Sequence, residues 1–214
     1  MSRRKSVMEE SSTVAPIAVC LTWKDSLKSF SAVLQQGFIL EARVNCSMSE
    51  ILCEQYGVTR EYLRERINTI FLDGKPVDDV DSGIIKDKSV LALSAAMPGF
   101  VGAAFRKSGF YAAMRREITY TGDRNRVGEE EGSFILKLYN LVAEELGPLF
   151  LRNGILIQAE LLGDFLQNRS EKFWLGCLKT SVDDREMELS TFRDGKWLPK
   201  SGLVQLRVVE DSRV

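Results

Sequence analysis

Apolar and polar residues alternate along the first part of the chain, and this alternation predicts a β-hairpin. Phe30, Ala32 and Leu34 occupy every second position, as is typical of a half-buried strand. A turn at 35–37 separates them from a second alternating run, Phe38–Val44. We expect the two runs to pair as antiparallel strands.

A helix is expected after this hairpin, because Ser47 and Glu50 have the spacing of a capping box. Apolar residues then recur at helical spacing until Gly57, which is expected to end the helix. Thr59 can cap a second helical stretch that runs to Ile67.

Residues 69–93 predict the rest of a small sheet. Thr69–Leu72 is an apolar strand, followed by an Asp-Gly turn at 73–74. Pro76 allows only a short edge strand, because proline cannot donate to a ladder. Val90–Leu93 is a further strand, so the expected order is strand, strand, helix, strand, short strand, strand.

That order resembles the β-grasp, or ubiquitin-like, fold, and most of all the small sulfur-carrier proteins of thiamine and molybdopterin synthesis. The resemblance covers residues 28–102. Ile70–Val77 (IFLDGKPV) is similar to a strand and turn of these carriers, and Lys86–Val90 (KDKSV) is similar to the approach to their last strand. Their extended tail, rich in Pro and Gly, has its counterpart here in Met97–Gly102.

The resemblance makes Gly99 and Gly102 the counterparts of the carriers' terminal glycines, whose carboxylate is adenylated and thiolated. Here the two glycines are not adjacent, and more than a hundred residues follow them. An internal peptide bond offers no carboxylate to activate, so carrier chemistry requires cleavage at this place.

The second half of the chain predicts helices followed by an antiparallel sheet. A helix is expected from Ser133 to Leu146, ended by the Gly-Pro at 147–148. Leu149–Ile157 is strongly apolar, and the apolar positions of 161–166 predict another short helix. The remaining runs, at 173–180, 187–189 and 204–208, read as the strands of a meander.

Together these patterns predict an α+β protein with four segments. They are a flexible tail (1–14), a β-grasp domain (15–97), a glycine-containing basic junction with a helix (98–132), and a helix-plus-antiparallel-sheet α+β domain (133–214). Ile17–Trp23 has strand character, but the sequence does not indicate which sheet receives it.

The junction interleaves aromatic residues with cations, and two interpretations stay open. It is either a surface that binds an acidic partner or anion, or an interdomain helix that buries Phe110 and Met114. Large apolar and Arg side chains dominate the energetics of protein interfaces, so we expect the side chains of these types in the junction to bind a partner. These residues are Phe100, Phe105, Arg106, Phe110, Tyr111, Arg115 and Arg116.

Composition narrows the chemistry. The chain has no histidine, which excludes Ser-His-Asp and Cys-His catalysis and His-ligated metals. None of the four cysteines (Cys20, Cys46, Cys53, Cys177) forms a Cys-x-x-Cys pair, so we expect no metal site, no cofactor and no catalytic residue. A net charge of −1, from 29 basic and 30 acidic residues, argues against a nucleic-acid-coating protein.

We therefore expect a non-enzymatic interaction or accessory protein that uses a ubiquitin-like module to bind another protein. The alternatives are a sulfur-carrier-like precursor and, third, an anion- or nucleotide-binding regulator. Glu9 and Glu10 interrupt any signal peptide, so a cytoplasmic location without membrane contact is expected. A second copy of the chain is also a candidate partner, with Leu149–Ile157 as the shared surface.

Overall fold

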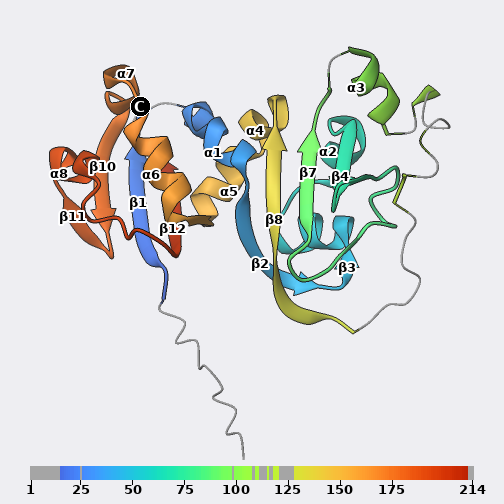
Figure 1. Ribbon diagram of the computed structural model, residues 1–214, viewed down its shortest axis with the longest axis horizontal. Helices are drawn as coiled ribbons and strands as arrows, with labels where there is room; N and C mark the ends of the chain where they lie inside the picture. Colours follow the sequence, from blue (N-terminus) through green and yellow to red (C-terminus); the bar gives the residue numbers. More distant parts are fainter. Residues whose placement is uncertain are drawn as a thin grey trace, which may run out of the picture.

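The computed structural model describes residues 15–24, 26–97, 99–107, 109–110, 115, 118–120 and 128–211, and the expected tail at 1–14 lies outside them. The fold is mixed α and β, with strands and helices along the whole described chain (Figure 1). The strands are β1 (Ile17–Trp23), β2 (Phe38–Val44), β3 (Cys46–Ser47), β4 (Thr69–Leu72), β5 (Lys75–Pro76), β6 (Ile84–Ile85), β7 (Val90–Ser94), β8 (Glu130–Tyr139), β9 (Ile155–Gln158), β10 (Cys177–Val182), β11 (Arg185–Met187) and β12 (Leu203–Glu210). The helices are η1 (Leu27–Phe30), α1 (Ser31–Gln36), η2 (Glu50–Gln55), α2 (Arg60–Glu65), α3 (Gly99–Phe105), α4 (Leu141–Glu145), α5 (Gly147–Asn153), α6 (Ala159–Gln167), α7 (Glu171–Trp174) and α8 (Leu189–Asp194).

Within the described residues one mixed sheet contains ten strands, in the order β11-β10-β1-β12-β9-β2-β8-β7-β4-β5. β3 and β6 form a separate two-stranded sheet. In Figure 1, α6 lies in front of the strands at the left, and α2 lies at the right, beside the upper end of β7.

The first strand of the expected hairpin is wrong, because residues 27–36 form the helices η1 and α1. Ser26 accepts a hydrogen bond from the backbone N of Lys28 (3.4 Å), which caps η1. The buried residues are Leu27, Phe30, Val33 and Leu34. Their spacing follows a helical face, and this outweighed the short alternation at 30–34.

The elements from β2 to β7 confirm the individual helices and strands expected between residues 38 and 94. The backbone N of Ser47 donates to Glu50 Oε2 (2.7 Å), and the backbone N of Glu50 donates to Ser47 Oγ (3.2 Å), as a capping box requires. Thr59 Oγ1 accepts from the backbone N of Tyr62 (3.2 Å) and caps α2. The turn at 73–74 and the short edge strand β5 lie where the sequence placed them.

The helix expected from Ser133 to Leu146 is wrong, because its first part is the strand β8. Phe134, Leu136 and Leu138 are buried while their neighbours are only half-buried, which is the period of a strand. β8 is hydrogen-bonded on both sides, to β2 and to β7. A strand buried this way carries apolar residues on both faces, and such a run imitates a helix.

The expected antiparallel meander is also corrected. Residues 171–174 are the helix α7, and Leu189 begins the helix α8 instead of continuing β11. β12 lies parallel to β1, with Val19 opposite Leu206, so the last strand does not follow its predecessors in a meander. The strand character of Ile17–Trp23 is confirmed, and it pairs with β10 and β12 from the far end of the chain.

The order of parallel and antiparallel strand pairs in the large sheet is the same from either edge to the centre. β2, β8, β7, β4 and β5 form one side (the β2 half), and β9, β12, β1, β10 and β11 form the other (the β9 half). In each half the pairs run antiparallel, parallel, antiparallel and antiparallel from the centre outward. The halves meet where Ile39 pairs with Leu156, antiparallel. The sheet therefore has an internal two-fold relationship.

The correspondence extends to single hydrogen bonds. Asp73 Oδ1 accepts from the backbone N of Val90 (2.7 Å), and Asp183 Oδ1 accepts from the backbone N of Ala18 (2.9 Å). Each of these aspartates also donates its own N–H to the carbonyl of the same partner, at 2.9 and 2.8 Å. Both occupy the first position of a two-residue turn with positive φ, 50° and 48°. Gly37 and Gly154, with φ of 111° and 94°, directly precede β2 and β9 in the same way.

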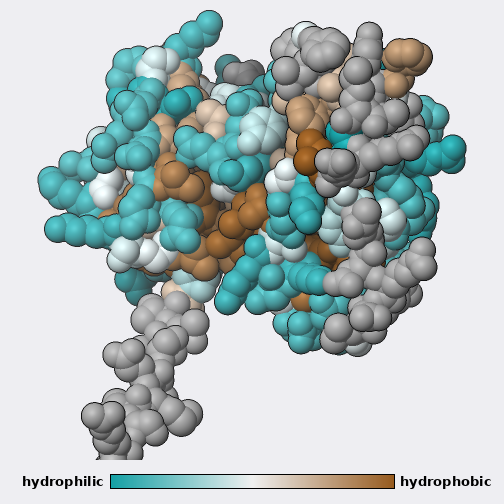
Figure 2. Space-filling model, turned by 45° about the vertical axis from the view of Figure 1, so that its right-hand side comes forward, coloured by the Kyte–Doolittle hydropathy of each residue, from teal (hydrophilic) through white to brown (hydrophobic). Residues whose placement is uncertain are grey.

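The helices and the buried side chains of the strands form one continuous core across both halves. In β2, Phe38 and Leu40 face this core, whereas Ile39 points to the opposite side and is half-buried. We call that opposite side the open face; Ile135 and Leu156 lie on it as well. Figure 2 brings the β2 half forward and shows hydrophobic side chains in a band across the middle of the molecule, bordered by hydrophilic surface.

The matched turns give a paired test. Replacing Asp183 with Ala removes one acceptor for a strand N–H and should lower the free energy of unfolding by about 1 kcal/mol. Asp73→Ala should lower it by about 2 kcal/mol, because Asp73 Oδ2 also accepts from Ser89 Oγ (3.0 Å). Urea unfolding measures both.

Asp184→Gly serves as the control for that pair. It copies Gly74 at the second turn position, where φ is 60° in this chain and 77° at the glycine. Glycine adopts such angles without steric cost, so the free energy of unfolding should rise by about 0.5 kcal/mol. Equal stability of Asp73→Ala and wild type would show that the turn contacts do not hold the neighbouring strand.

Candidate functional site

The described part of the junction begins with α3, which replaces the extended tail expected there. Gly99 is exposed and has φ of 76°. Gly102 is buried, and a Cβ added to it would lie 1.8 Å from the carbonyl oxygen of Met97. No side chain fits at that distance, so the close approach of the backbone explains glycine at position 102.

Arg115 fixes the junction to the end of the sheet. Its guanidinium is buried, with 4% of the side chain exposed, and pairs with both carboxylate oxygens of Asp78 at 2.6 and 3.1 Å. It also donates to the carbonyls of Ala104 (2.8 Å) and Arg106 (3.2 Å) and to Thr119 Oγ1 (3.0 Å). Arg115, expected to face a partner, instead binds its own chain.

Lys107 provides a second anchor, at the end of α2. Its backbone N donates to the carbonyl of Asn68 (2.6 Å), and its Nζ donates to the carbonyls of Leu63 (2.9 Å) and Arg64 (3.3 Å). A cation is favourable at the carboxyl end of a helix. Burial, and secondly the charge of Arg64, lower the pKa of the Lys107 ammonium.

The junction also covers the edge of the sheet. The backbone N of Tyr120 donates to the carbonyl of Pro76 in β5 (2.9 Å). The ring of Phe105 packs against Phe71 of β4, with 5.2 Å between centroids. The edge and part of the open face of the β2 half are thus occupied by the junction itself.

Two large apolar side chains of the junction point outward. Phe110 is 92% exposed and Ile118 is 53% exposed, and Arg106 is exposed nearby in the sequence. The side chain of Phe100 and the residues Tyr111 and Arg116 lie outside the described residues. Phe105 and Arg115 therefore make separate contacts within the chain, whereas Phe110 and Arg106 lie at the surface.

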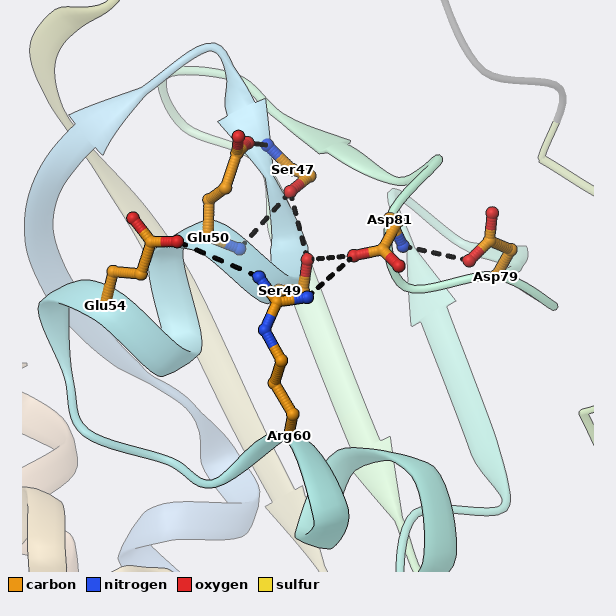
Figure 3. Close-up of polar contacts among 7 residues, drawn as sticks. All are labelled: Ser47, Ser49, Glu50, Glu54, Arg60, Asp79 and Asp81. Carbon is orange, nitrogen blue, oxygen red and sulfur yellow. Dashed lines mark hydrogen bonds and ion pairs between the residues drawn. The ribbon is translucent and has the colours of Figure 1, made fainter.

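A polar cluster that the sequence had indicated only as a helix cap surrounds the start of η2 (Figure 3). Ser49, 1% exposed, donates its hydroxyl to Asp81 Oδ1, and Ser47 Oγ lies 3.1 Å from Ser49 Oγ. Arg60 approaches both Asp81 (3.6 Å) and Glu54 (3.8 Å). Figure 3 shows Asp81 in contact with both Ser49 and Arg60, with its loop beside the helix start.

The hydrogen bonds of this cluster hold a loop against the start of a helix. The hydroxyl of Ser49 is bonded to a carboxylate, and the capping box occupies Ser47 and Glu50. The backbone N of Asp81 donates to Asp79 Oδ1 (3.0 Å), which closes the loop at 79–82. We therefore assign these residues to holding this loop on η2.

The described residues contain no group of three or more His, Cys, Asp or Glu arranged to hold a metal ion. Nor does any helix among them have the length and apolar character needed to cross a bilayer. Comparison with known protein families, with curated proteins and with solved structures finds no match to this chain. The assignment of function therefore depends on the geometry of the junction.

The anchoring role of Arg115 is testable. Arg115→Ala removes the hydrogen bonds from the guanidinium to the Asp78 carboxylate and to two carbonyls, and should lower the free energy of unfolding by about 3 kcal/mol. Trypsin should then cut between residues 99 and 120 faster than in wild type. In the control Arg106→Ala the lost side chain is exposed, so stability should change by less than about 0.5 kcal/mol. Unchanged proteolysis of Arg115→Ala would contradict the anchor.

Thiol reactivity tests burial in the β9 half. Burial raises the pKa of the Cys177 thiol to about 11, against a smaller opposing effect of the backbone of Lys179. At pH 8 only about one thiol in a thousand is then a thiolate, the reactive form. Iodoacetamide should leave Cys177 unmodified in native protein and label it after unfolding in guanidinium, as read by peptide mass spectrometry. Rapid native labelling at pH 8 would show that the thiol is not buried as described.

Proposed function

We propose that the protein is a non-enzymatic interaction protein that binds another protein through the junction. The observation that supports this is the contrast within one segment. Two of its cations, Lys107 and Arg115, are used to anchor it, while Phe110 remains 92% exposed. Scattered single apolar residues are normal on a surface, but a large aromatic side chain on an anchored segment is typical of an interface.

The anchors matter energetically. A segment that must be ordered on binding loses conformational entropy, which weakens the complex. Arg115 and Tyr120 hold the junction before a partner arrives, so this cost is reduced. The partner expected for such a segment presents an apolar pocket for Phe110 with acidic groups at its rim for Arg106.

We further propose that the β2 half is a β-grasp unit in a permuted order. In a β-grasp the first two strands form an antiparallel hairpin, and the first strand also lies parallel to the last. Here β8 is antiparallel to β2 and parallel to β7, so β8 takes the place of the first strand although it comes last in the chain. The β9 half has the same pairing senses, with β12 in the place of β8.

The sulfur-carrier alternative has less support than this proposal. Gly99 and Gly102 lie in α3, and the chain beyond them returns as β8 to the middle of the sheet. A cut at Gly102 would therefore leave both fragments bound to each other. The anion-binding alternative is weakened because Lys107 and Arg115 are directed at internal oxygens.

The proposed function is tested by affinity purification of N-terminally tagged protein from its natural cells. We expect a stoichiometric partner that is retained by wild type and by Leu175→Ala, an equally drastic change at a 79% exposed position in the β9 half. Phe110→Ala should lose it, with a Kd at least about 10-fold weaker when both purified proteins are recombined.

Two results of that experiment would contradict the proposal. One is that Phe110→Ala and Ile118→Ala keep every companion of the wild type. The other is an intact mass corresponding to a chain that ends at Gly99 or Gly102, especially with added sulfur, which would instead support the carrier alternative. A full-length mass closes that alternative.

A further inference from the structure

A cavity of about 400 Å³ lies on the open face of the β2 half. It is bordered by the carboxyl ends of the parallel strands β7 and β8 and by Met97, which directly precedes the junction. Its volume falls in the range of small-molecule sites, roughly 300–1,000 Å³. Its lining includes Thr69, Phe71, Ala92, Met97, Tyr139 and Asn140.

The lining offers apolar surface and a few hydroxyl and amide groups, and none of its described side chains carries a charge. Thr69 is only 2% exposed and is one of the residues that line the cavity. Its hydroxyl can donate a hydrogen bond to a polar group of a ligand or accept one from it.

Asn140, at the rim, has a strained backbone. Its φ of 53° and ψ of −133° lie outside the regions that non-glycine residues normally adopt. Its side-chain amide nitrogen donates to Ser94 Oγ (3.3 Å) and to the carbonyl of Ala96 (3.0 Å), which fixes the end of β7 to the end of β8. Strain of this kind concentrates at binding sites, where the surrounding contacts maintain a required shape.

The internal two-fold relationship supplies a control within the same molecule. By strand register the counterparts of Phe71, Ala92 and Thr69 in the β9 half are Ser181, Cys20 and Lys179. The hollow at that place is lined instead by charged residues, among them Lys179, Glu186 and Arg207. An uncharged apolar cavity is therefore not imposed by the sheet and belongs to the β2 half alone among the described residues.

We propose that this cavity binds a neutral, predominantly apolar small molecule with a flat aromatic body and one hydrogen-bonding group. Phe71 and Tyr139 favour an aromatic ligand, and Thr69 pairs with its polar group. A charged ligand would lose its hydration without gaining a countercharge in this lining. The inference goes beyond protein binding by the junction and does not depend on it.

Fluorescence titration with N-phenyl-1-naphthylamine, which is neutral, tests the site. We expect saturable binding of one probe per chain. The anionic analogue 8-anilino-1-naphthalenesulfonate has the same ring system and should bind at least about 10-fold more weakly, because its sulfonate has no countercharge in the cavity. Equal affinity for the two probes would overturn the assignment of a neutral ligand.

Variants locate the probe. Ala92→Leu fills the cavity and should abolish saturable binding, whereas Cys20→Leu adds the same side chain at the corresponding position of the β9 half and should preserve it. Thr69→Val, which keeps the shape and removes the hydroxyl, should weaken binding about 3- to 10-fold. Circular dichroism shows whether each variant is folded. If Ala92→Leu does not fold, the affinity of Thr69→Val for the probe tests the site instead.

The outcome is separable from that of the proposed function. Phe110→Ala should lose the protein partner and keep the probe, since Phe110 is not among the residues that line the cavity. Undiminished binding to folded Ala92→Leu, or equal loss in Cys20→Leu, would overturn the proposed cavity site. Loss of the probe in Phe110→Ala alone would show that the probe binds the junction and would also overturn it.

Discussion

The two-sided pairing of β8 is the constraint on which the rest of the structure depends. β8 donates and accepts backbone hydrogen bonds with β2 on one side and β7 on the other. Both neighbours come from before the junction, and β8 comes from after it. The junction must therefore leave the sheet at the end of β7 and return to its opposite end, and Arg115, Lys107 and Tyr120 hold the part of this path that the structure describes. Large parts of the chain on either side are joined through this one strand.

The same arrangement, repeated in the β9 half, gives the sheet its symmetry. Ile39 and Leu156 pair at the centre, and equivalent aspartates, Asp73 and Asp183, hold equivalent strands in each half. The shared part is the backbone scaffold and its turns. The open face is where the halves differ, with Phe71 and Ala92 in one and Ser181 and Cys20 in the other. The β2 half is therefore the half to which we assign the proposed functions, because both the junction and the uncharged cavity lie there.

The junction illustrates how one segment combines two roles. The buried guanidinium of Arg115 and the half-buried ammonium of Lys107 donate to carbonyls of neighbouring elements, which gives a loop-like segment a fixed position. With those cations turned inward, Phe110 and Arg106 are the predicted contact residues that the structure leaves exposed. The interpretation that the junction buries Phe110 is wrong, and Met114 lies outside the described residues. Binding of an acidic partner or anion stays a prediction.

The sequence by itself determined the local elements whose signals are chemical. The capping box at Ser47 and Glu50, the cap at Thr59, the turn at Asp73 and the strand at 204–208 were recognised without a distant partner. Only the tertiary structure decided that residues 30–34 are helical, that 133–139 are a strand, and that β1 lies between β10 and β12. Short apolar runs fit both periods, and the choice is made by which neighbours supply hydrogen bonds and cover the side chains. The burial of Arg115 and the cavity lined by Thr69 and Asn140 likewise arise from segments far apart in the chain, whose approach no local pattern encodes.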